Sequence, residues 1–381
     1  MRLNDLQATR SPFLIGLRCL RCQAHVADLD QPEGCSACSA KGQASSFACV
    51  YEGMPREGAV AQPYRSPISM GEGNTPLVTL PSQAHGAGRV YLKLESANPT
   101  GSHKDRMAAL GATHARATGR RGLLAASSGN AGLAAAAYAA FAGLDCEVMI
   151  TAQCPPLYRA LMQEHGAKLV ECATSAERWH RLAARSAEDE SLLSLTNYVI
   201  PAVGSPAIMV EGYKNITAEI VASLALNAPT PLRIYVPVAR GDLLFGLALG
   251  FSQLLGSGAL ATMPQLVAVE PFPRLSAVAA GQDYRALFDG TTQQFSTSGN
   301  TVTWQSIEAL RITQGRAVVI DDAQAFAARA ALARLGFSVE LCAAAAYAAC
   351  CDDIAKSEES PISIVIATAH GSRDAALFHS L

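Results

Sequence analysis

The sequence predicts an α/β fold with two mainly parallel-sheet, three-layer domains. Short apolar runs of strand length alternate with longer segments that have helical spacing, an order typical of strand–helix–strand units. The chain has 381 residues, of which 50% are hydrophobic, so it can bury two full cores and carry a small extra module. Four cysteines near the N-terminus indicate that this module is a ribbon.

The expected elements follow from these runs. We expect strands at Val90–Leu94, Gly122–Ala126, Cys146–Ile150, Lys168–Cys172, Leu232–Val236, Leu266–Val269, Ala317–Ile320 and Ile362–Ala367. We expect helices at Lys104–Thr118, Asn130–Phe141, Pro156–His165, Ser175–Ala187, Ala207–Leu224, Leu243–Leu255, Ala323–Leu335 and Cys342–Lys356. In open sheets of this kind, ligands bind beyond the carboxyl ends of the strands, at helix N-termini.

Four of the eleven cysteines form two C-x2-C pairs separated by twelve residues, namely Cys19, Cys22, Cys35 and Cys38. In a reducing compartment this spacing favours a tetrahedral zinc site over disulfides. The alternative is a ribbon that folds without metal. We expect residues 1–52 to form a zinc-ribbon-like module, and the remaining cysteines to be small buried core residues.

Composition excludes several function classes. The net charge of −2 provides no basic field for nucleic acid or an anionic membrane surface. The most apolar run, Ala131–Leu144, is too short to span a bilayer and is expected to be a buried helix. The segment Met1–Leu17 lacks the apolar core of a secretory signal, so we expect a cytoplasmic protein.

The central stretch of the chain is Asn98–Arg106, between an expected strand and an expected helix. Ser102 followed by Asp105 has the capping-box form, which places Lys104 in the first helical turn. A helix N-terminus disfavours a cation, and only a neutral amine attacks an aldehyde. The alternative is a solvated surface lysine without a role.

Two further stretches, Ala125–Gly132 and Ile234–Gly246, share this order of strand, turn and helix. Besides these and the lysine stretch, the chain contains the motifs Gly71–Leu77, Glu211–Lys214 and Thr368–Gly371. In this order they resemble the threonine synthase branch of the fold type II, tryptophan synthase β-like, pyridoxal 5'-phosphate enzymes. The resemblance implies a large domain from residues 53–89 and 206–381 and a small domain from residues 90–205. It also implies a pyridoxal phosphate cofactor, a small amino-acid substrate and, by analogy with relatives, a homodimer.

The resemblance assigns roles to single residues. Lys104 would bind the cofactor covalently and then carry protons at the substrate. Asn130 would donate to the cofactor's 3'-oxygen, and its alternative is a helix N-cap. Thr368 would face the ring nitrogen, and its alternative is a buried threonine at a strand end. The substrate carboxylate would be taken by the loop that contains Ser127, Ser128, Gly129 and Ala131.

The phosphate loop departs from the family pattern, which has a glycine-rich turn. It would consist of Val238, Ala239, Arg240, Gly241 and Asp242, with one glycine. A carboxylate at Asp242 should lower affinity for a dianion, while Arg240 can pair with phosphate. His103 matches the tryptophan synthase β subunits, where that histidine contacts the phosphate. The alternatives are that Asp242 only caps a helix beginning at Leu243 and that His103 packs as a neutral ring.

Three functions remain open from the sequence. The first is conversion of O-phosphohomoserine to threonine, which needs a second anion site. Arg106 matches the family there, and Lys214, His370 and Arg373 are further candidates, each with a surface role as the alternative. The second is β-replacement or β-elimination on another amino acid, as in cysteate synthase-like, diaminopropionate-forming or ammonia-lyase enzymes. The third is a non-catalytic relative with a binding role.

Overall fold

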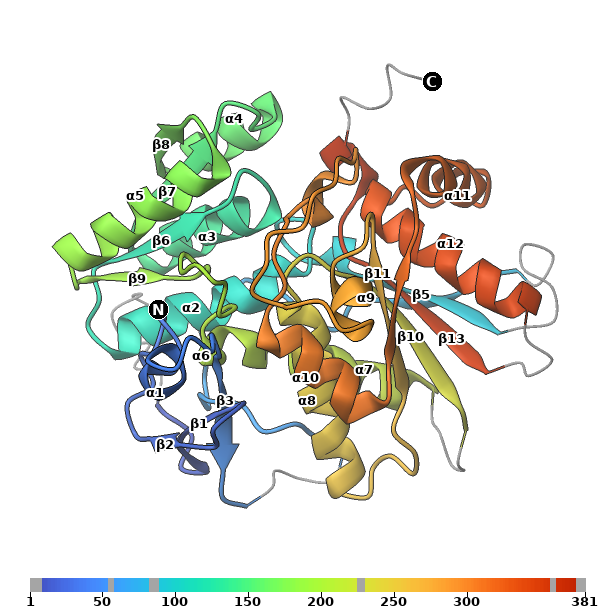
Figure 1. Cartoon of the computed structure of the whole chain (residues 1–381), viewed down its shortest axis with the longest axis horizontal. Coiled ribbons are helices and arrows are strands. Elements are labelled where there is room, and N and C mark those ends of the chain that lie inside the picture. Colours follow the sequence, from blue (N-terminus) through green and yellow to red (C-terminus); the bar gives the residue numbers. More distant parts are fainter. Residues whose placement is uncertain (1–8, 54–57, 82–88, 225–229, 357–360, 375–381) are drawn as a thin grey trace. The chain divides into compact units, whose positions relative to one another are not determined.

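The computed structural model describes residues 9–53, 58–81, 89–224, 230–356 and 361–374 (Figure 1). The chain divides into two compact units. Unit 1 consists of Met1–Met54, Ala61–Glu72 and Lys104–Gly212, and unit 2 consists of Pro55–Val60, Gly73–His103 and Tyr213–Leu381. Each unit has its own parallel sheet and its own apolar core.

Unit 1 contains a four-stranded parallel sheet in the order β8-β7-β6-β9. Its strands are β6 (Gly122–Ala126), β7 (Asp145–Thr151), β8 (Lys168–Cys172) and β9 (Leu192–Ser194). Its helices are α2 (Lys104–Ala117), α3 (Asn130–Ala142), α4 (Pro156–Glu164), α5 (Ser175–Glu188) and α6 (Ala207–Val210). Because β6 is buried along its whole length, it forms the centre of this unit, and α3 and α5 pack against it.

The N-terminal ribbon belongs to unit 1. It has an antiparallel sheet in the order β2-β1-β3, formed by β1 (Leu14–Cys19), β2 (His25–Val26) and β3 (Phe47–Tyr51), with the short helix α1 (Ser36–Ser39). Leu17 and Phe47 share an apolar cluster with Ala207. The hydroxyl of Tyr51 donates to Glu211 Oε2 at 2.5 Å. The ribbon is therefore fixed to the segment around α6 by both apolar and polar contacts.

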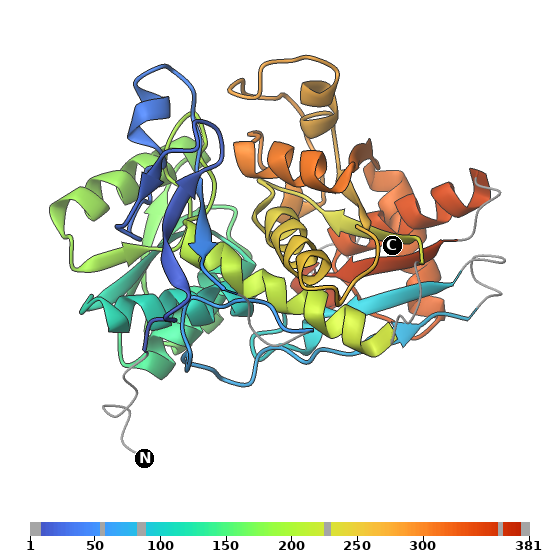
Figure 2. The same cartoon turned by 90° about the horizontal axis from the view of Figure 1, so that it is seen from below.

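Unit 2 contains a six-stranded sheet in the order β12-β11-β10-β13-β5-β4. Its strands are β4 (Leu77–Thr79), β5 (Val90–Leu94), β10 (Leu232–Pro237), β11 (Gln265–Glu270), β12 (Arg316–Val319) and β13 (Ile362–Ala367), and only β4 is antiparallel to its neighbour. Its helices are α7 (Lys214–Leu224), α8 (Asp242–Gly256), α9 (Leu275–Ala279), α10 (Trp304–Thr313), α11 (Asp322–Arg334) and α12 (Leu341–Lys356). Figure 2 shows α7 and α8 side by side, in agreement with their contacts.

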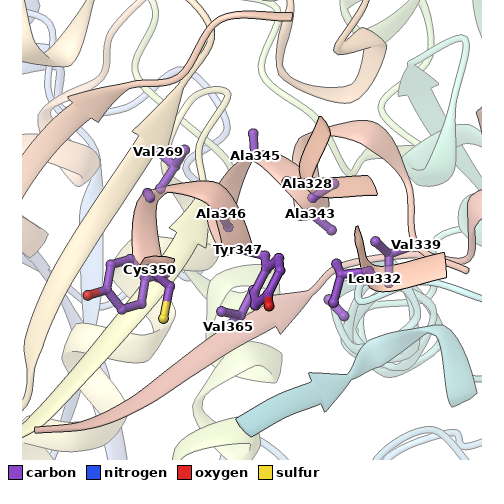
Figure 3. Close-up of a cluster of buried hydrophobic side chains, with 14 of the residues drawn as sticks. Val269, Ala328, Leu332, Val339, Ala343, Ala345, Ala346, Tyr347, Cys350 and Val365 are labelled. Atoms are coloured by element: carbon purple, nitrogen blue, oxygen red, sulfur yellow. The ribbon is translucent and has the colours of Figure 1, made fainter. Parts of the chain in front are cut away.

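The core of unit 2 lies between α12 and the sheet (Figure 3). Tyr347 and Cys350 of α12 lie close to Val365 of β13, and Leu332 of α11 completes the same cluster. The repeated alanines of α12 have short side chains, so α11 and the sheet can both pack closely against this helix. Within the described ranges, none of the helices combines the length and hydropathy that crossing a bilayer requires.

The predicted α/β fold is confirmed, and all eight predicted strands are present within one residue at each end. The predicted helix at Ala207–Leu224 is interrupted by a 3-10 turn at Glu211–Tyr213. At this turn the backbone lies close to α2. A Cβ on Gly212 would lie 2.2 Å from the carbonyl oxygen of Arg106, so the position requires a glycine. Strands β4 and β9 and helices α9 and α10 were not predicted, because they are short or lack a clear apolar period.

The division into units differs from the predicted domains. The strand Val90–Leu94 was expected to open the small domain, but it pairs with β13 and β4 in the sheet of unit 2. The chain enters unit 1 only at Lys104. The strand's own apolar pattern suits either sheet, so its sequence could not decide between them.

Candidate active site

The predicted site residues form two sets, one in each unit. Lys104, Arg106, Asn130 and the loop 127–131 belong to unit 1, and His103, the loop 238–242 and Thr368 belong to unit 2.

Lys104 is the first residue of α2, so it lies in the first helical turn as predicted, and it is half-buried. Arg106, two residues later, is 3% exposed. Nearby in unit 1, the hydroxyl of Tyr138 on α3 donates to Glu72 Oε2 at 2.7 Å, and the backbone N–H of Met70 donates to the same oxygen at 2.9 Å. This pair joins the Gly71–Leu77 motif, of which Glu72 is part, to the helix that begins at Asn130.

The loop between β6 and α3 is shaped by close backbone contacts. A Cβ on Gly132 would lie 2.5 Å from the carbonyl oxygen of Ser127, so the loop closes only over a glycine. The hydroxyl oxygen of Ser127 accepts from the N–H of Gly129 at 3.3 Å, which leaves its O–H able to donate. The first N–H groups of α3 have no intrahelical partner, so this loop presents donors suited to a carboxylate.

The hydroxyl of Ser128 is directed toward the body of unit 1 instead. Ser128 is 3% exposed, and its Oγ accepts from the N–H of Thr151 at 2.9 Å. The guanidinium of Arg178 on α5 also donates to this oxygen at 3.4 Å. Ser128 therefore fixes the loop to the end of β7, whereas the hydroxyl of Ser127 contacts the loop itself.

Asn130 is the first residue of α3, and Gly129 is the N-cap, so the interpretation of Asn130 as the N-cap is wrong. The hydroxyl of Tyr158 on α4 donates to Asn130 Oδ1 at 2.7 Å. Both side chains are buried, at 2% and 6% exposure. Because Tyr158 donates to this oxygen, the orientation of the amide is fixed, and the NH2 is the donor end of the group. Sequence reasoning missed Tyr158, since nothing local marks a tyrosine that reaches another helix.

In unit 2, Tyr213 connects three of the predicted residues. The backbone N–H of His103 donates to the carbonyl oxygen of Thr368 at 2.9 Å. The ring of His103 lies 5.7 Å from the ring of Tyr213, whose hydroxyl donates to Asp242 Oδ2 at 3.1 Å. His103, Thr368 and Asp242 are thus brought together, and Tyr213, to which its motif alone gave no role, links them.

Thr368 follows β13 directly and is 2% exposed. Its Oγ1 lies 3.8 Å from the Sγ of Cys342, the second residue of α12. Burial raises the pKa of Cys342 well above its usual value, so the group remains a thiol that can donate to the hydroxyl oxygen. A neutral hydroxyl supported by a neutral thiol therefore stands at the end of this strand.

The loop between β10 and α8 ends in Gly241, which is the N-cap and has φ +93°. The helix begins at Asp242, so the prediction that Asp242 caps a helix beginning at Leu243 is wrong by one residue. The left-handed glycine followed by a helix turns successive N–H groups the same way, an arrangement that binds anions. Arg240 is half-buried; desolvation lowers the pKa of its guanidinium, while the charge of Asp242 opposes that effect.

The predicted zinc ligands are brought together in the ribbon. The sulfur atoms of Cys19, Cys22, Cys35 and Cys38 all lie within 4.8 Å of one another. Two of the separations are 3.7 Å, from Cys19 to Cys38, and 3.6 Å, from Cys22 to Cys35. A tetrahedral zinc ion with Zn–S bonds of about 2.3 Å would place its sulfur ligands about 3.8 Å apart.

Comparison with known proteins decides the family. A family model described as pyridoxal-phosphate dependent enzyme matches residues 68–369. The chain belongs to this family. It is 31% identical over 294 residues to the threonine synthase of Mycobacterium leprae, a match that covers 74% of this chain and 76% of that protein. The predicted resemblance to the threonine synthase branch of the fold type II enzymes is therefore confirmed.

Solved structures show the same fold. The cysteine synthase of Entamoeba histolytica has a TM-score of 0.67 at 19% identity, over 85% of this chain and 94% of that one. The threonine deaminase of T.th. has a TM-score of 0.64 at 23% identity, over 78% of this chain and 92% of that one. The chain is accordingly a pyridoxal-phosphate-dependent lyase with the tryptophan synthase β-like fold.

The residues present fit this cofactor. Three observations carry the fit, namely the lysine at the start of α2, the buried amide of Asn130 whose oxygen Tyr158 holds, and the N–H groups after the left-handed Gly241. A lysine, an amide donor and an anion-binding helix N-terminus match an aldehyde, a phenolic oxygen and a phosphate.

We expect Gly241→Ala to destabilise unit 2 by more than the backbone strain of an alanine at positive φ explains. A Cβ there would lie 2.4 Å from the Cβ of Ser306, in addition to the strain of φ +93°. The matched control is Gly281→Ala, where φ is +105° but no atom lies within 4 Å of the added Cβ. Urea unfolding should give a loss of about 1–2 kcal/mol for the control and about 1–3 kcal/mol more for Gly241→Ala. Equal losses would contradict the packing of the loop on α10.

Proposed function

We propose that this lyase converts O-phosphohomoserine to threonine. The observation that carries the proposal is Lys104 at the first position of α2, in a chain of which 74% aligns with a threonine synthase. We also propose that residues 127–131 bind the substrate carboxylate and that the segments at 103, 238–242 and 368 bind the cofactor.

In this proposal Lys104 has two tasks. Pyridoxal phosphate, when bound, supplies an electron sink that stabilises negative charge at the α-carbon of an amino acid. Lys104 would hold the cofactor through its Nζ, and its free amine would carry protons at the α and β carbons of the substrate.

The other residues bind and orient. Asn130 donates its NH2 to the phenolic oxygen, because Tyr158 occupies its own oxygen. The Ser127 hydroxyl and the N–H groups at the start of α3 hold the substrate carboxylate. Thr368 presents a hydroxyl, and not a carboxylate, to the ring nitrogen. That choice leaves the nitrogen uncharged, which suits elimination and replacement better than transamination.

The phosphate of the substrate needs a cation. Three of the sequence candidates have structural contacts in unit 2. Lys214 is fully buried and donates to Gln253 Oε1 at 3.3 Å. The guanidinium of Arg373 donates to the carbonyl oxygen of Thr100. The exposed ring of His370 forms a hydrogen bond with the hydroxyl of Ser372. In unit 1, Arg178 reaches the substrate loop through Ser128. We propose Arg106, which the resemblance to the family indicates, and Arg178, which donates to Ser128 of the substrate loop, as the cations that serve the substrate.

A second candidate is β-elimination or β-replacement on another amino acid. Two features favour it, namely the Ser-Gly-Asn-Ala-Gly sequence of the loop, which occurs in less specialised relatives, and the fold neighbours, which include a cysteine synthase and a threonine deaminase. Both candidates require Lys104 and the same loop, so the substrate separates them.

We expect Lys104→Ala to abolish turnover and the covalent attachment of the cofactor. The wild-type protein should show a visible absorption band that borohydride removes, with the added mass on the peptide that contains Lys104. The matched control is Lys41→Ala, a change at an exposed lysine of the ribbon. Phosphate release from O-phosphohomoserine would support the first candidate, and release of ammonia or a β-substituent without it would support the second. Turnover that persists in Lys104→Ala would refute both.

Tyr158→Phe should weaken cofactor binding without unfolding the chain. The change leaves Asn130 Oδ1 buried without its donor, so the amide loses its fixed orientation. A lost hydrogen bond of about 1–2 kcal/mol corresponds to an affinity lower by roughly 5- to 30-fold, with a shifted absorption maximum. The control Tyr235→Phe removes the bond of another tyrosine hydroxyl, to Asp353 at 2.8 Å in a part-buried setting of unit 2. An equal fall in cofactor affinity and an equal shift of the absorption maximum in both variants would show that Tyr158 has no orienting role.

We also propose that the four ribbon cysteines bind one zinc ion. Burial raises the pKa of Cys19, but hydrogen bonds from Ser45 and from the backbone outweigh this effect and lower it to about 7, which favours a thiolate ligand. Metal analysis should find one zinc per chain, and Cys35→Ser should remove it. The control Cys351→Ser, a change in unit 2, should leave the zinc content unchanged. A metal-free protein whose melting temperature is unaffected by a chelator would contradict the proposal.

A further inference from the structure

Three consecutive carbonyl oxygens of the loop between β10 and α8 are held by side chains from elsewhere in unit 2. The guanidinium of Arg274 donates to the oxygen of Val238 at 2.8 Å and to that of Ala239 at 3.3 Å. The hydroxyl of Thr303 donates to the oxygen of Arg240 at 2.6 Å. A carbonyl oxygen facing an anion repels it, so these contacts decide which polar groups the loop can present.

Arg274 is well suited to hold this loop because it is itself fixed. It is 1% exposed, lies just before α9, and also donates to the carbonyl oxygen of Gly299. Its guanidinium lies 3.6 Å from the equally buried Glu270 at the end of β11. Glu270 accepts from the N–H groups of residues 274, 275 and 276 at 3.2, 2.9 and 2.8 Å. The buried ion pair is thus supported by hydrogen bonds, as such a pair requires.

The chemistry of arginine explains why this residue can serve. Its planar group offers five donors in a fixed fork, which lets one side chain reach the carbonyls of two separate segments. Burial lowers the pKa of Arg274 to about 10 against the opposing effect of Glu270, so the guanidinium stays protonated at neutral pH. Lysine has one nitrogen and could not span the same oxygens with the same geometry.

We propose that Arg274 is a positioning residue for the cofactor phosphate, which holds the carbonyls of Val238 and Ala239 away so that the N–H groups around Gly241 face the phosphate. Arg274 thereby replaces the conformational freedom that a glycine-rich turn would provide. The inference rests on the proposed assignment of residues 238–242 to the phosphate. Arg274 acts through the backbone, while Arg240 in the loop is the residue that can approach the phosphate.

The test compares pyridoxal phosphate with pyridoxal, which lacks the phosphate. Arg274→Met keeps the length and apolar stem of the side chain but removes the donors, and Arg274→Lys keeps the charge. In both variants we expect affinity for pyridoxal phosphate to fall about 10- to 100-fold, since bonds to a charged donor are lost, with affinity for pyridoxal nearly unchanged. The surface variant Arg311→Met should keep the wild-type ratio, because that side chain is 69% exposed.

Two further measurements test the proposal if these variants fold poorly. Thr303→Val removes the bond to the Arg240 oxygen, together with the N-cap bond that Thr303 accepts from the N–H of Ser306, and should lower the ratio of the two affinities in the same direction. Guanidinium ion added at millimolar concentration should restore phosphate-dependent binding in Arg274→Ala. A parallel fall in both affinities, without rescue, would show that Arg274 only stabilises the fold. If the wild-type protein bound both compounds equally, the assignment of the phosphate loop would itself be wrong.

Discussion

The helix N-terminus is the physical constraint on which the site depends. Lys104, Asn130 and Asp242 are each the first residue of a helix, of α2, α3 and α8. At that position the backbone N–H groups have no intrahelical partner, and the helix carries partial positive charge. These helix starts carry a lysine amine, a side-chain amide and a set of backbone N–H groups that can bind an anion. One type of chain connection therefore supplies three different chemical groups.

These helix starts are held in place by buried side chains from distant parts of the sequence. Tyr158 fixes Asn130 within unit 1, and Tyr213 fixes Asp242 within unit 2. The end of β5 in unit 2 is anchored by Lys93, fully buried, whose Nζ lies 2.5 Å from Glu219 Oε2. Each contact is a hydrogen bond or ion pair removed from water, where loss of one partner is costly. The geometry of the site thus depends on polar contacts as much as on the apolar cores.

The sequence predicted the elements well because each is encoded locally. An apolar run of six residues rich in isoleucine and valine, such as Ile362–Ala367, is typical of a buried strand, and the glycines at 129 and 241 mark the ends of loops. The sheet to which β5 belongs, the break at Gly212 and the partners Tyr158 and Arg274 depend on contacts between residues far apart in the chain. Nothing in the neighbouring residues records such contacts, so the motifs could be recognised while the side chains that orient them could not.

In the proposed phosphate loop at 238–242, buried side chains take the place of a glycine-rich turn. A glycine-rich turn reaches the necessary conformation because it lacks Cβ atoms, whereas this loop keeps side chains and has its carbonyls held by Arg274 and Thr303. Only Gly241 is still required, because its φ is positive and Ser306 leaves no room for a Cβ. This arrangement lets the loop carry Arg240, a cation that a run of glycines cannot offer, and this cation opposes the unfavourable charge of Asp242. If residues 238–242 bind the phosphate as proposed, a weak sequence motif is compatible with a well-defined phosphate site, because the buried arginine holds the backbone.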